Sequence, residues 1–361
     1  MTITRKREYS FDNCKLILII LVVFAHFLEF SKGYGAKDDW YRIIYSFHMP
    51  AMVFIAGYFA KFNKKNIFTL SFLYLIFQNG YISFANKKLN QNLNFQITTP
   101  YWLLWFLLAY IFYLMLIPLL DFKKYNKKNI FYSLIIIAVT FFIHFYFPKD
   151  KTQGYYLSVS RFITFLPFFV SGFYFNKLMK NEKAQKYLYK GISGIVIRII
   201  FLLLVFLAIH IIKYNKNISP NMLYGSYSYK SAKYSDNIKA KITFCSIVWI
   251  GFIIFTLRFN KKIFILTRMG STSLTIFLFH GFILRYIQYK EYFKFHEVDR
   301  KLIFLFSICI VAMLGNIIME YFSKYILHLK ILDVFKKIYL KFYDRIININ
   351  LDFNDDFIDI N

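Results

Sequence analysis

The chain has 361 residues, of which 58% are hydrophobic and 22% aromatic, with 46 Phe and 30 Tyr among them. This apolar share excludes an ordinary soluble domain and indicates a protein that crosses a membrane several times. The formal net charge of +27 would suit a nucleic-acid partner. However, the basic residues lie between apolar runs, where lysines anchor helix ends to anionic headgroups. No nucleic-acid partner is therefore expected.

The chain contains a series of apolar runs, each about as long as a helix that crosses a bilayer. They predict an all-α polytopic transmembrane bundle of about ten spans, at 14–31, 42–61, 67–84, 102–120, 130–147, 162–179, 192–213, 242–257, 271–289 and 301–323. Lys and Arg are more frequent in the loops on the side of the N-terminus, which predicts that both termini are cytoplasmic.

Residues 1–325 are expected to form one membrane domain. In the segment 326–361, basic residues first alternate with apolar ones, which predicts an amphipathic helix on the cytoplasmic membrane surface. The segment ends in an acidic stretch that we expect to be disordered. The first apolar run carries His26 and Glu29 and has no small-residue cleavage site, so a cleavable signal peptide is not expected.

The first apolar run also holds ionisable residues, which are costly inside a membrane and mark function by default. Lys15 and His26 are eleven residues apart, which places them within about 20° of one helix face and roughly 16 Å apart along the axis. Glu29 follows His26 by three residues, where its carboxylate can orient the imidazole. This pattern predicts His26 and Glu29 as catalytic residues.

A second histidine is expected at the same depth. His48 lies near the outer end of the second run, and two runs joined by a short loop are antiparallel neighbours. His26 and His48 can therefore meet. An imidazole titrates near neutral pH, so it can take a proton from a hydroxyl or carry an acyl group.

Proline and glycine recur together in two runs. Pro50 follows His48 and loosens the backbone there, and Gly57 suits a close helix contact. The run 162–179 has the same order, with Pro167 followed by Gly172.

Further polar residues lie in or next to the later runs. Arg161 precedes the run 162–179, while His280 and Arg285 lie within the run 271–289. The loop 214–241 carries a Tyr- and Ser-rich stretch, which suits either a carbohydrate site or an aromatic belt at the membrane interface.

Two other sets of residues carry no predicted chemistry. Two histidines near outer ends are expected to reach the interface without a catalytic role: His144 and His210. The three cysteines have no paired spacing, so buried thiols are expected without a metal or disulfide: Cys14, Cys245 and Cys309.

Five segments, taken in order, resemble the membrane acyltransferase type 3 family, and the branch most like this chain is that of the fucose 4-O-acetylase-like polysaccharide O-acetyltransferases. They are Tyr9-Ser10-Phe11-Asp12-Asn13 with Lys15 and His26, Phe47-His48-Met49-Pro50, Trp105-Phe106-Leu107-Leu108, Leu166-Pro167-Phe168-Phe169, and Leu274 through His280-Gly281. The resemblance covers about residues 7–325. In much of the family an Arg stands where this chain has Lys15, and a Lys offers a point charge without the bidentate fork.

The resemblance implies an O-acetyltransferase in the cell membrane of a bacterium. It would move an acetyl group from cytoplasmic acetyl-CoA to a sugar hydroxyl of a cell-surface or capsular polysaccharide, or of its lipid-linked precursor, without a metal. Its partners would be membrane lipids and the glycan acceptor, with self-association or attachment to glycan-synthesis machinery left open.

Each candidate residue has a role in this hypothesis. Lys15 would bind the donor. His26 would be a general base or acyl carrier, oriented by Glu29, and His48 a second base or an oxyanion donor. The acceptor would meet Arg161, His280 and Arg285. A narrow cytoplasm-facing channel lined by the first, second and ninth spans is expected to end near His26.

Two other classes of protein remain open from the sequence. Charges within the membrane also build translocation paths, so a glycan-lipid transporter or flippase is one alternative. A structural component of a polysaccharide synthesis or export machine is the other.

Overall fold

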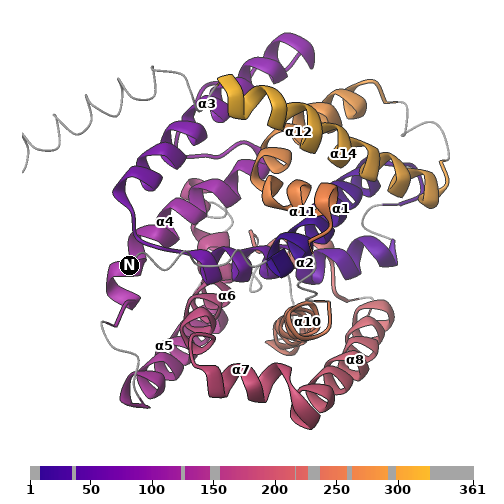
Figure 1. Cartoon of the computed structure of the whole chain (residues 1–361). Coiled ribbons are helices and arrows are strands. Elements are labelled where there is room, and N and C mark those ends of the chain that lie inside the picture. The colour runs from indigo at the N-terminus through magenta and orange to yellow at the C-terminus, as the bar shows by residue number, and fades with distance from the viewer. Residues whose placement is uncertain are drawn as a thin grey trace, which may run out of the picture. The chain divides into compact units, whose positions relative to one another are not determined.

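The computed structural model describes residues 9–34, 38–122, 127–146, 155–215, 217–226, 236–257, 262–291 and 298–325. Over these ranges every regular element is a helix (Figure 1). The chain divides into two units, Met1–Gly315 and Asn316–Asn361. All described helices up to residue 289 lie in the first unit. The predicted tail 326–361 lies outside the described residues.

The helices follow one another with short connections. In chain order they are α1 (Tyr9–Phe30), α2 (Asp39–Phe59), α3 (Lys64–Lys88), η2 (Trp102–Leu104), α4 (Trp105–Leu120), α5 (Lys127–Tyr146), η3 (Tyr156–Ser158), α6 (Val159–Leu178), α7 (Glu182–Tyr189), α8 (Gly191–Tyr214), α9 (Pro220–Leu223), α10 (Asp236–Phe255), α11 (Phe264–Ser271), α12 (Ser273–Tyr289) and α14 (Arg300–Tyr325). Each predicted apolar run overlaps one long helix. The short helices α7, α9 and α11 were not predicted.

Seven helices of the described ranges are long and apolar enough to cross a membrane. They are Tyr9–Phe30, Lys64–Lys88, Trp102–Leu120, Lys128–Tyr146, Tyr156–Leu178, Gly191–Tyr214 and Asn237–Phe255. The chain is thus an all-helical, multi-pass membrane protein. The count of about ten spans remains a prediction. Helix α2 is not among these seven, and α12 has only 17 residues.

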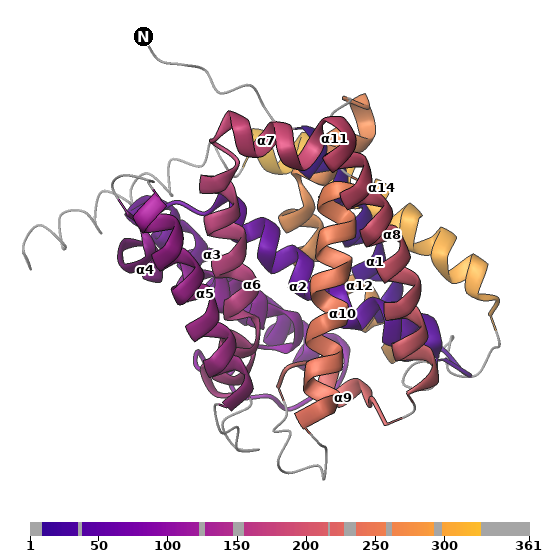
Figure 2. The ribbon, with the colours of Figure 1, turned by 90° about the horizontal axis from the view of Figure 1, so that it is seen from below.

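Helix α2 occupies the interior of the first unit. It packs against α1, α6 and α10, and α10 packs in turn against α8 (Figure 2). Nearly all of α2 from Tyr41 to Tyr58 is buried. A helix that is enclosed on every side can carry polar groups only where neighbours satisfy them, so the polar side chains of α2 identify a candidate site.

The close crossing of α2 and α6 depends on two glycines. A Cβ atom at Gly57 would overlap the backbone of Phe169, and one at Gly172 would overlap the carbonyl oxygen of Phe54. The sequence prediction of glycine at a helix contact is confirmed. Pro50 and Pro167 lie inside these same two helices.

Gly172→Ala is expected to destabilise the protein by roughly 1–3 kcal/mol, because the added methyl would press on backbone atoms that cannot move aside. Gly80→Ala is the matched control, since a Cβ there would meet only the Phe282 ring at 3.6 Å, an ordinary contact. Thermal unfolding of the detergent-solubilised variants would measure both. Equal midpoints for the two variants would contradict the account of this crossing.

The cysteines only partly follow the prediction. Cys14 and Cys245 are buried, but Cys309 is exposed. It lies on α14, where Leu302, Phe304, Leu305 and Phe306 are also exposed. An apolar surface of this kind suits contact with lipid.

Candidate active site

Three helices bring three histidines to one region. His26 comes from α1, His48 from α2 and His280 from α12. The rings of His26 and His280 stack with centroids 5.7 Å apart and planes 28° from parallel. Tyr45 links the other pair, because its ring lies 6.1 Å from that of His26 and 4.8 Å from that of His48.

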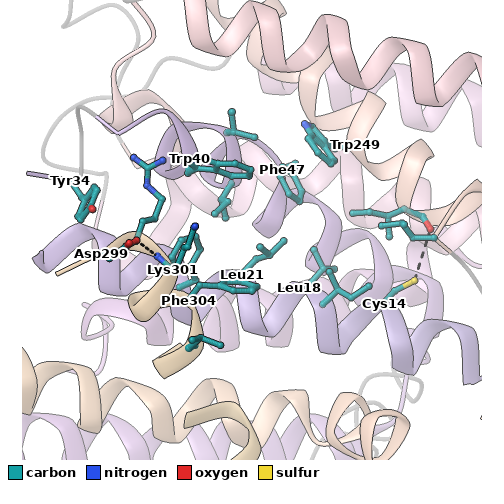
Figure 3. A pocket seen from close by; sticks show the side chains of 18 residues that line it. Cys14, Leu18, Leu21, Tyr34, Trp40, Phe47, Trp249, Asp299, Lys301 and Phe304 are labelled. Atoms are coloured by element: carbon teal, nitrogen blue, oxygen red, sulfur yellow. Dashed lines mark hydrogen bonds between the residues drawn. The ribbon is translucent and has the colours of Figure 1, made fainter. Parts of the chain in front are cut away.

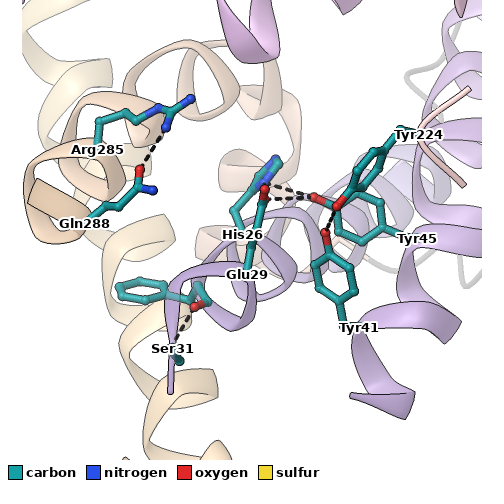
Figure 4. A network of polar contacts seen from close by, with 9 residues as sticks. His26, Glu29, Ser31, Tyr41, Tyr45, Tyr224, Arg285 and Gln288 are labelled. Carbon is teal, nitrogen blue, oxygen red and sulfur yellow. Dashed lines mark hydrogen bonds and ion pairs between the residues drawn. The ribbon is translucent and has the colours of Figure 1, made fainter. Parts of the chain in front are cut away.

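The Nδ1 atom of His26 faces two oxygen atoms (Figure 4). Glu29 Oε2 lies 3.3 Å from it and the Tyr45 hydroxyl 3.2 Å, while the same hydroxyl donates to Glu29 Oε2 at 3.3 Å. A carboxylate can only accept, so Nδ1 carries the proton and Nε2 of the neutral ring has the free lone pair. The spacing of three residues predicted this pairing, and the structure confirms its geometry.

The other two histidines have the same tautomer for a different reason. His48 Nδ1 lies 2.7 Å from the carbonyl oxygen of Ile44, and His280 Nδ1 lies 2.7 Å from that of Phe277. A carbonyl oxygen only accepts, so both Nδ1 atoms donate and both Nε2 atoms are acceptors in the neutral ring. His280 is fully buried, and its Nε2 has no hydrogen-bond partner among the residues that the structure describes. All three neutral rings therefore leave Nε2 as the acceptor.

Pro50 changes the backbone next to His48. Proline has no N–H, so the carbonyl oxygen of Ser46, four residues earlier, loses its helical donor. The Ser246 hydroxyl of α10 donates to that oxygen at 2.6 Å. A buried hydrogen bond between α10 and α2 thus compensates for the helical hydrogen bond that Pro50 removes.

Arg285 joins the cluster through an aromatic ring. Its guanidinium lies 4.2 Å from the ring centroid of Trp102, and that ring lies 4.8 Å from the His26 ring. Arg285 Nη1 also donates to Gln288 Oε1 at 2.8 Å (Figure 4). The two residues predicted in the run 271–289, His280 and Arg285, therefore both approach His26.

Arg161 reaches the cluster through Tyr224. Its Nε donates to the carbonyl oxygen of Tyr224 at 3.3 Å, and its guanidinium lies 5.1 Å from the centroid of Trp105. The Tyr224 hydroxyl lies 2.5 Å from that of Tyr41, and its ring packs on Tyr45 at 5.2 Å. The loop 214–241 suited either a carbohydrate site or an aromatic belt, and the structure turns its Tyr224 inward.

Lys15 lies at the opposite end of α1, where its Nζ pairs with Asp12 at 2.8 Å. Both line a cavity of about 740 Å³ whose wall also carries three further lysines, Lys61, Lys177 and Lys180. The remaining lining comes from α2, α4, α6 and the residues that directly follow α2 and α4. The sequence predicted α12 in the channel wall, whereas this cavity has α4 and α6 there. An ion pair joins Lys177 to Asp121 at its edge.

A second cavity, of about 1000 Å³, lies on another face of α1 (Figure 3). Its wall is mostly apolar and runs from Cys14 past Leu21 to Phe304, with Asp299 and Lys301 at one end (Figure 3). None of the three clustered histidines lines it. Its size therefore does not make it the catalytic site, because no histidine lines it and its ionisable residues are not part of the histidine cluster.

The sequence did not identify several residues of the cluster. Tyr45 lies three residues before His48, so its place on the same helix face was an available signal. Trp102 and Tyr224 are remote in sequence from His26 and His48, so no periodicity placed them in the cluster. His144 was expected at the interface, but it is buried with Nε2 3.0 Å from the Thr243 hydroxyl, whereas His210 is exposed.

The arrangement is that of an integral membrane protein with a buried basic cluster and a lysine-lined cavity at the other end of one helix. In the described ranges, no group of three or more His, Cys, Asp or Glu residues could hold a metal ion. A family model described as an acyltransferase domain matches residues 8–321. The chain belongs to this acyltransferase family.

Two relatives match short segments. The chain is 39% identical over 62 residues to Nodulation protein NolL of Mesorhizobium japonicum, which is 16% of this chain and 17% of that protein. It is 41% identical over 59 residues to Nodulation protein NolL of Sinorhizobium fredii, which is 15% and 16% of the two chains. The matched segments thus cover much less than half of either relative. No solved structure matches.

Proposed function

We propose that this protein transfers an acetyl group from acetyl-CoA to a sugar hydroxyl of a cell-surface or capsular polysaccharide, or of its lipid-linked precursor. The observation that carries the proposal is the His26 imidazole, whose Nδ1 faces Glu29 and Tyr45 while Nε2 is left as a base. Membership of the acyltransferase family supports the reaction class.

His26 Nε2 would take the proton of the acceptor hydroxyl as its oxygen attacks the thioester carbonyl carbon. Glu29 would stabilise the resulting imidazolium through Nδ1. The carbon–sulfur bond then breaks, and the proton passes from Nε2 to the departing thiolate. A transient acyl group on His26 is the alternative course.

His48 is the candidate for a second base. Its Nδ1–H is already bonded to the Ile44 carbonyl oxygen, so neutral His48 offers only an acceptor at Nε2. This favours the role of base over that of an oxyanion donor, since a donor to an oxyanion must carry a proton.

The lysine-lined cavity is the proposed donor site. Lys15, Lys61, Lys177 and Lys180 surround it, and clustered cations attract the phosphates of CoA. With both termini cytoplasmic and about ten spans, this end of α1 would face the cytoplasm, where the donor is made. The roughly 16 Å between Lys15 and His26 along the helix suits an extended pantetheine arm.

The acceptor would approach from the other end of the cluster. Arg285 and Gln288 lie there on α12, and Arg161 lies at the start of α6. Guanidinium and amide groups hydrogen-bond sugar hydroxyls, and His280 Nε2 offers a buried acceptor nearby. The proposed location is the plasma membrane of a bacterium, and both relatives come from bacteria.

Purified protein in lipid nanodiscs, given radiolabelled acetyl-CoA and candidate glycans, tests the proposal. Labelled glycan and free CoA should appear in equal amounts. A transporter or flippase would move a glycan lipid across a vesicle membrane without releasing CoA, and that result would overturn the enzyme assignment. Competition by succinyl-CoA would measure the preference for the acyl group.

Tyr45→Phe is expected to lower the turnover of acetyl transfer by roughly tenfold. The variant loses the hydroxyl that donates to the Glu29 carboxylate and also lies 3.2 Å from His26 Nδ1. The ring and its packing on His48 are retained. Tyr187→Phe, at an exposed position of α7, is the control. Turnover equal to that of the control would show that Tyr45 only fills space.

A further inference from the structure

The turn that leads into α4 contains a strained residue. Trp102 opens η2 with a φ of +38°, in the left-handed region that bulky residues rarely adopt. Strained backbone of this kind persists only where the surrounding structure holds it, and it gathers at functional sites.

A buried glutamine holds this turn in place. Gln78 of α3 is fully buried, and its Nε2 donates to the carbonyl oxygens of Gln96 and Thr99 at 2.7 and 2.9 Å. Its Oε1 accepts from the backbone N–H of Tyr101 at 2.8 Å. The Leu157 N–H adds a bond to the Thr98 carbonyl oxygen at 2.6 Å. The backbone before Trp102 is therefore fixed from two sides.

The strained conformation directs the indole into the histidine cluster. The Trp102 ring meets the His26 ring at 4.8 Å and an angle of 63°, and it lies 6.4 Å from the His280 ring. The Arg285 guanidinium lies over the Trp102 ring, 4.2 Å from the ring centroid. The Trp102 side chain thus touches the His26 imidazole, approaches the His280 ring that stacks on it, and contacts the Arg285 guanidinium.

We propose that Trp102 is a positioning residue for acyl transfer, which rests on the function proposed above. Its indole fixes the orientation of the His26 ring, so that Nε2 points at the reacting hydroxyl. It also holds Arg285 over its own face by a cation–π contact, which directs that cation toward Gln288. A small misorientation of a catalytic base is enough to lower turnover strongly.

Trp102→Gly and Trp102→Phe separate this role from a structural one. Glycine adopts a positive φ without strain, so Trp102→Gly removes the indole and at the same time relieves the backbone. Its turnover is expected to fall at least about tenfold, while the KM for acetyl-CoA and the thermal unfolding midpoint stay near those of wild type. Trp102→Phe keeps a ring and is expected to recover most of the turnover.

A second measurement does not depend on transferase activity. Diethyl pyrocarbonate acylates unprotonated imidazole nitrogens, and mass spectrometry gives the rate at each histidine. Without the indole the His26 ring loses its cover, so its modification is expected to be at least about threefold faster in Trp102→Gly. The exposed His210 should react at the same rate in every variant.

The outcomes distinguish the two proposals. A wild-type protein that transfers no acetyl group overturns the proposed function, while the His26 modification rates still test Trp102. Trp102→Gly with turnover within twofold of wild type, or with an unchanged His26 modification rate, overturns the positioning role. If Trp102→Gly has a lower unfolding midpoint and Trp102→Phe loses as much turnover as Trp102→Gly does, Trp102 serves only in packing. This result also overturns the proposal.

Discussion

His26→Ala is expected to lower the rate of acetyl transfer by roughly 10²–10⁴-fold, the usual loss when a general base or covalent carrier is removed. The imidazole is the one group of the cluster whose Nδ1 is paired with a carboxylate. Its side chain is only 12% exposed, against 31% for Glu29. Radiolabelled glycan formed per unit of membrane-inserted protein is the measurement.

The same substitution should leave expression near normal. Within the described part of the chain, His26 hydrogen-bonds to Glu29 and Tyr45 and to no backbone group of another helix. His210→Ala, at an exposed position on α8, is the matched control and should keep full activity. Transfer by His26→Ala above roughly a tenth of the wild-type rate would exclude both roles, base and carrier.

Glu29→Gln tests whether the Glu29 carboxylate takes part in catalysis. The amide oxygen can still accept from His26 Nδ1, but it no longer stabilises the positive charge that forms on the ring. The decrease in the rate of acetyl transfer is therefore expected to lie between the decreases in Tyr45→Phe and His26→Ala. A rate equal to wild type would remove Glu29 from the site.

Helix periodicity predicted those parts of the site that one helix contains. His26 and Glu29 are three residues apart, and the structure brings Nδ1 and Oε2 to 3.3 Å. The close contacts at Gly57 and Gly172 were predictable for a similar reason, since a glycine in an apolar helix marks where another backbone approaches. These features are set by residues that are neighbours in sequence.

Contacts between remote segments were not predictable in this way. Trp102 meets His26 only because Gln78 and Leu157 fix the turn before α4, and no periodicity carries that information. Tyr224 belongs to a loop whose composition suggested the surface, yet it packs on Tyr41 and Tyr45. Hydropathy also predicted the run 271–289 but not the short helix α11 that precedes it. There Gly270 brings α11 against the backbone of Asp12.

Lys15→Glu is expected to weaken the binding of acetyl-CoA by at least about tenfold, which corresponds to about 1.4 kcal/mol. Lys15 lines the cavity that also carries Lys61, Lys177 and Lys180, so a reversed charge there repels the CoA phosphates. Lys15→Arg keeps the cation and should keep activity. The KM for the donor should rise while turnover at saturating donor changes little, since Lys15 lies far from the reacting atoms.

Charge reversal also sets a carboxylate against Asp12, which pairs with Lys15 at 2.8 Å, so Lys15→Gln is measured beside it to separate repulsion from loss of fold. Lys186→Glu is the matched control, because that lysine lies exposed on α7 and does not line the cavity. The wild-type KM should rise with ionic strength, as expected for attraction between exposed charges, and that of Lys15→Gln should rise less steeply. If Lys15→Glu binds CoA as tightly as the control does, Lys15 only anchors the end of α1, and the donor site lies elsewhere.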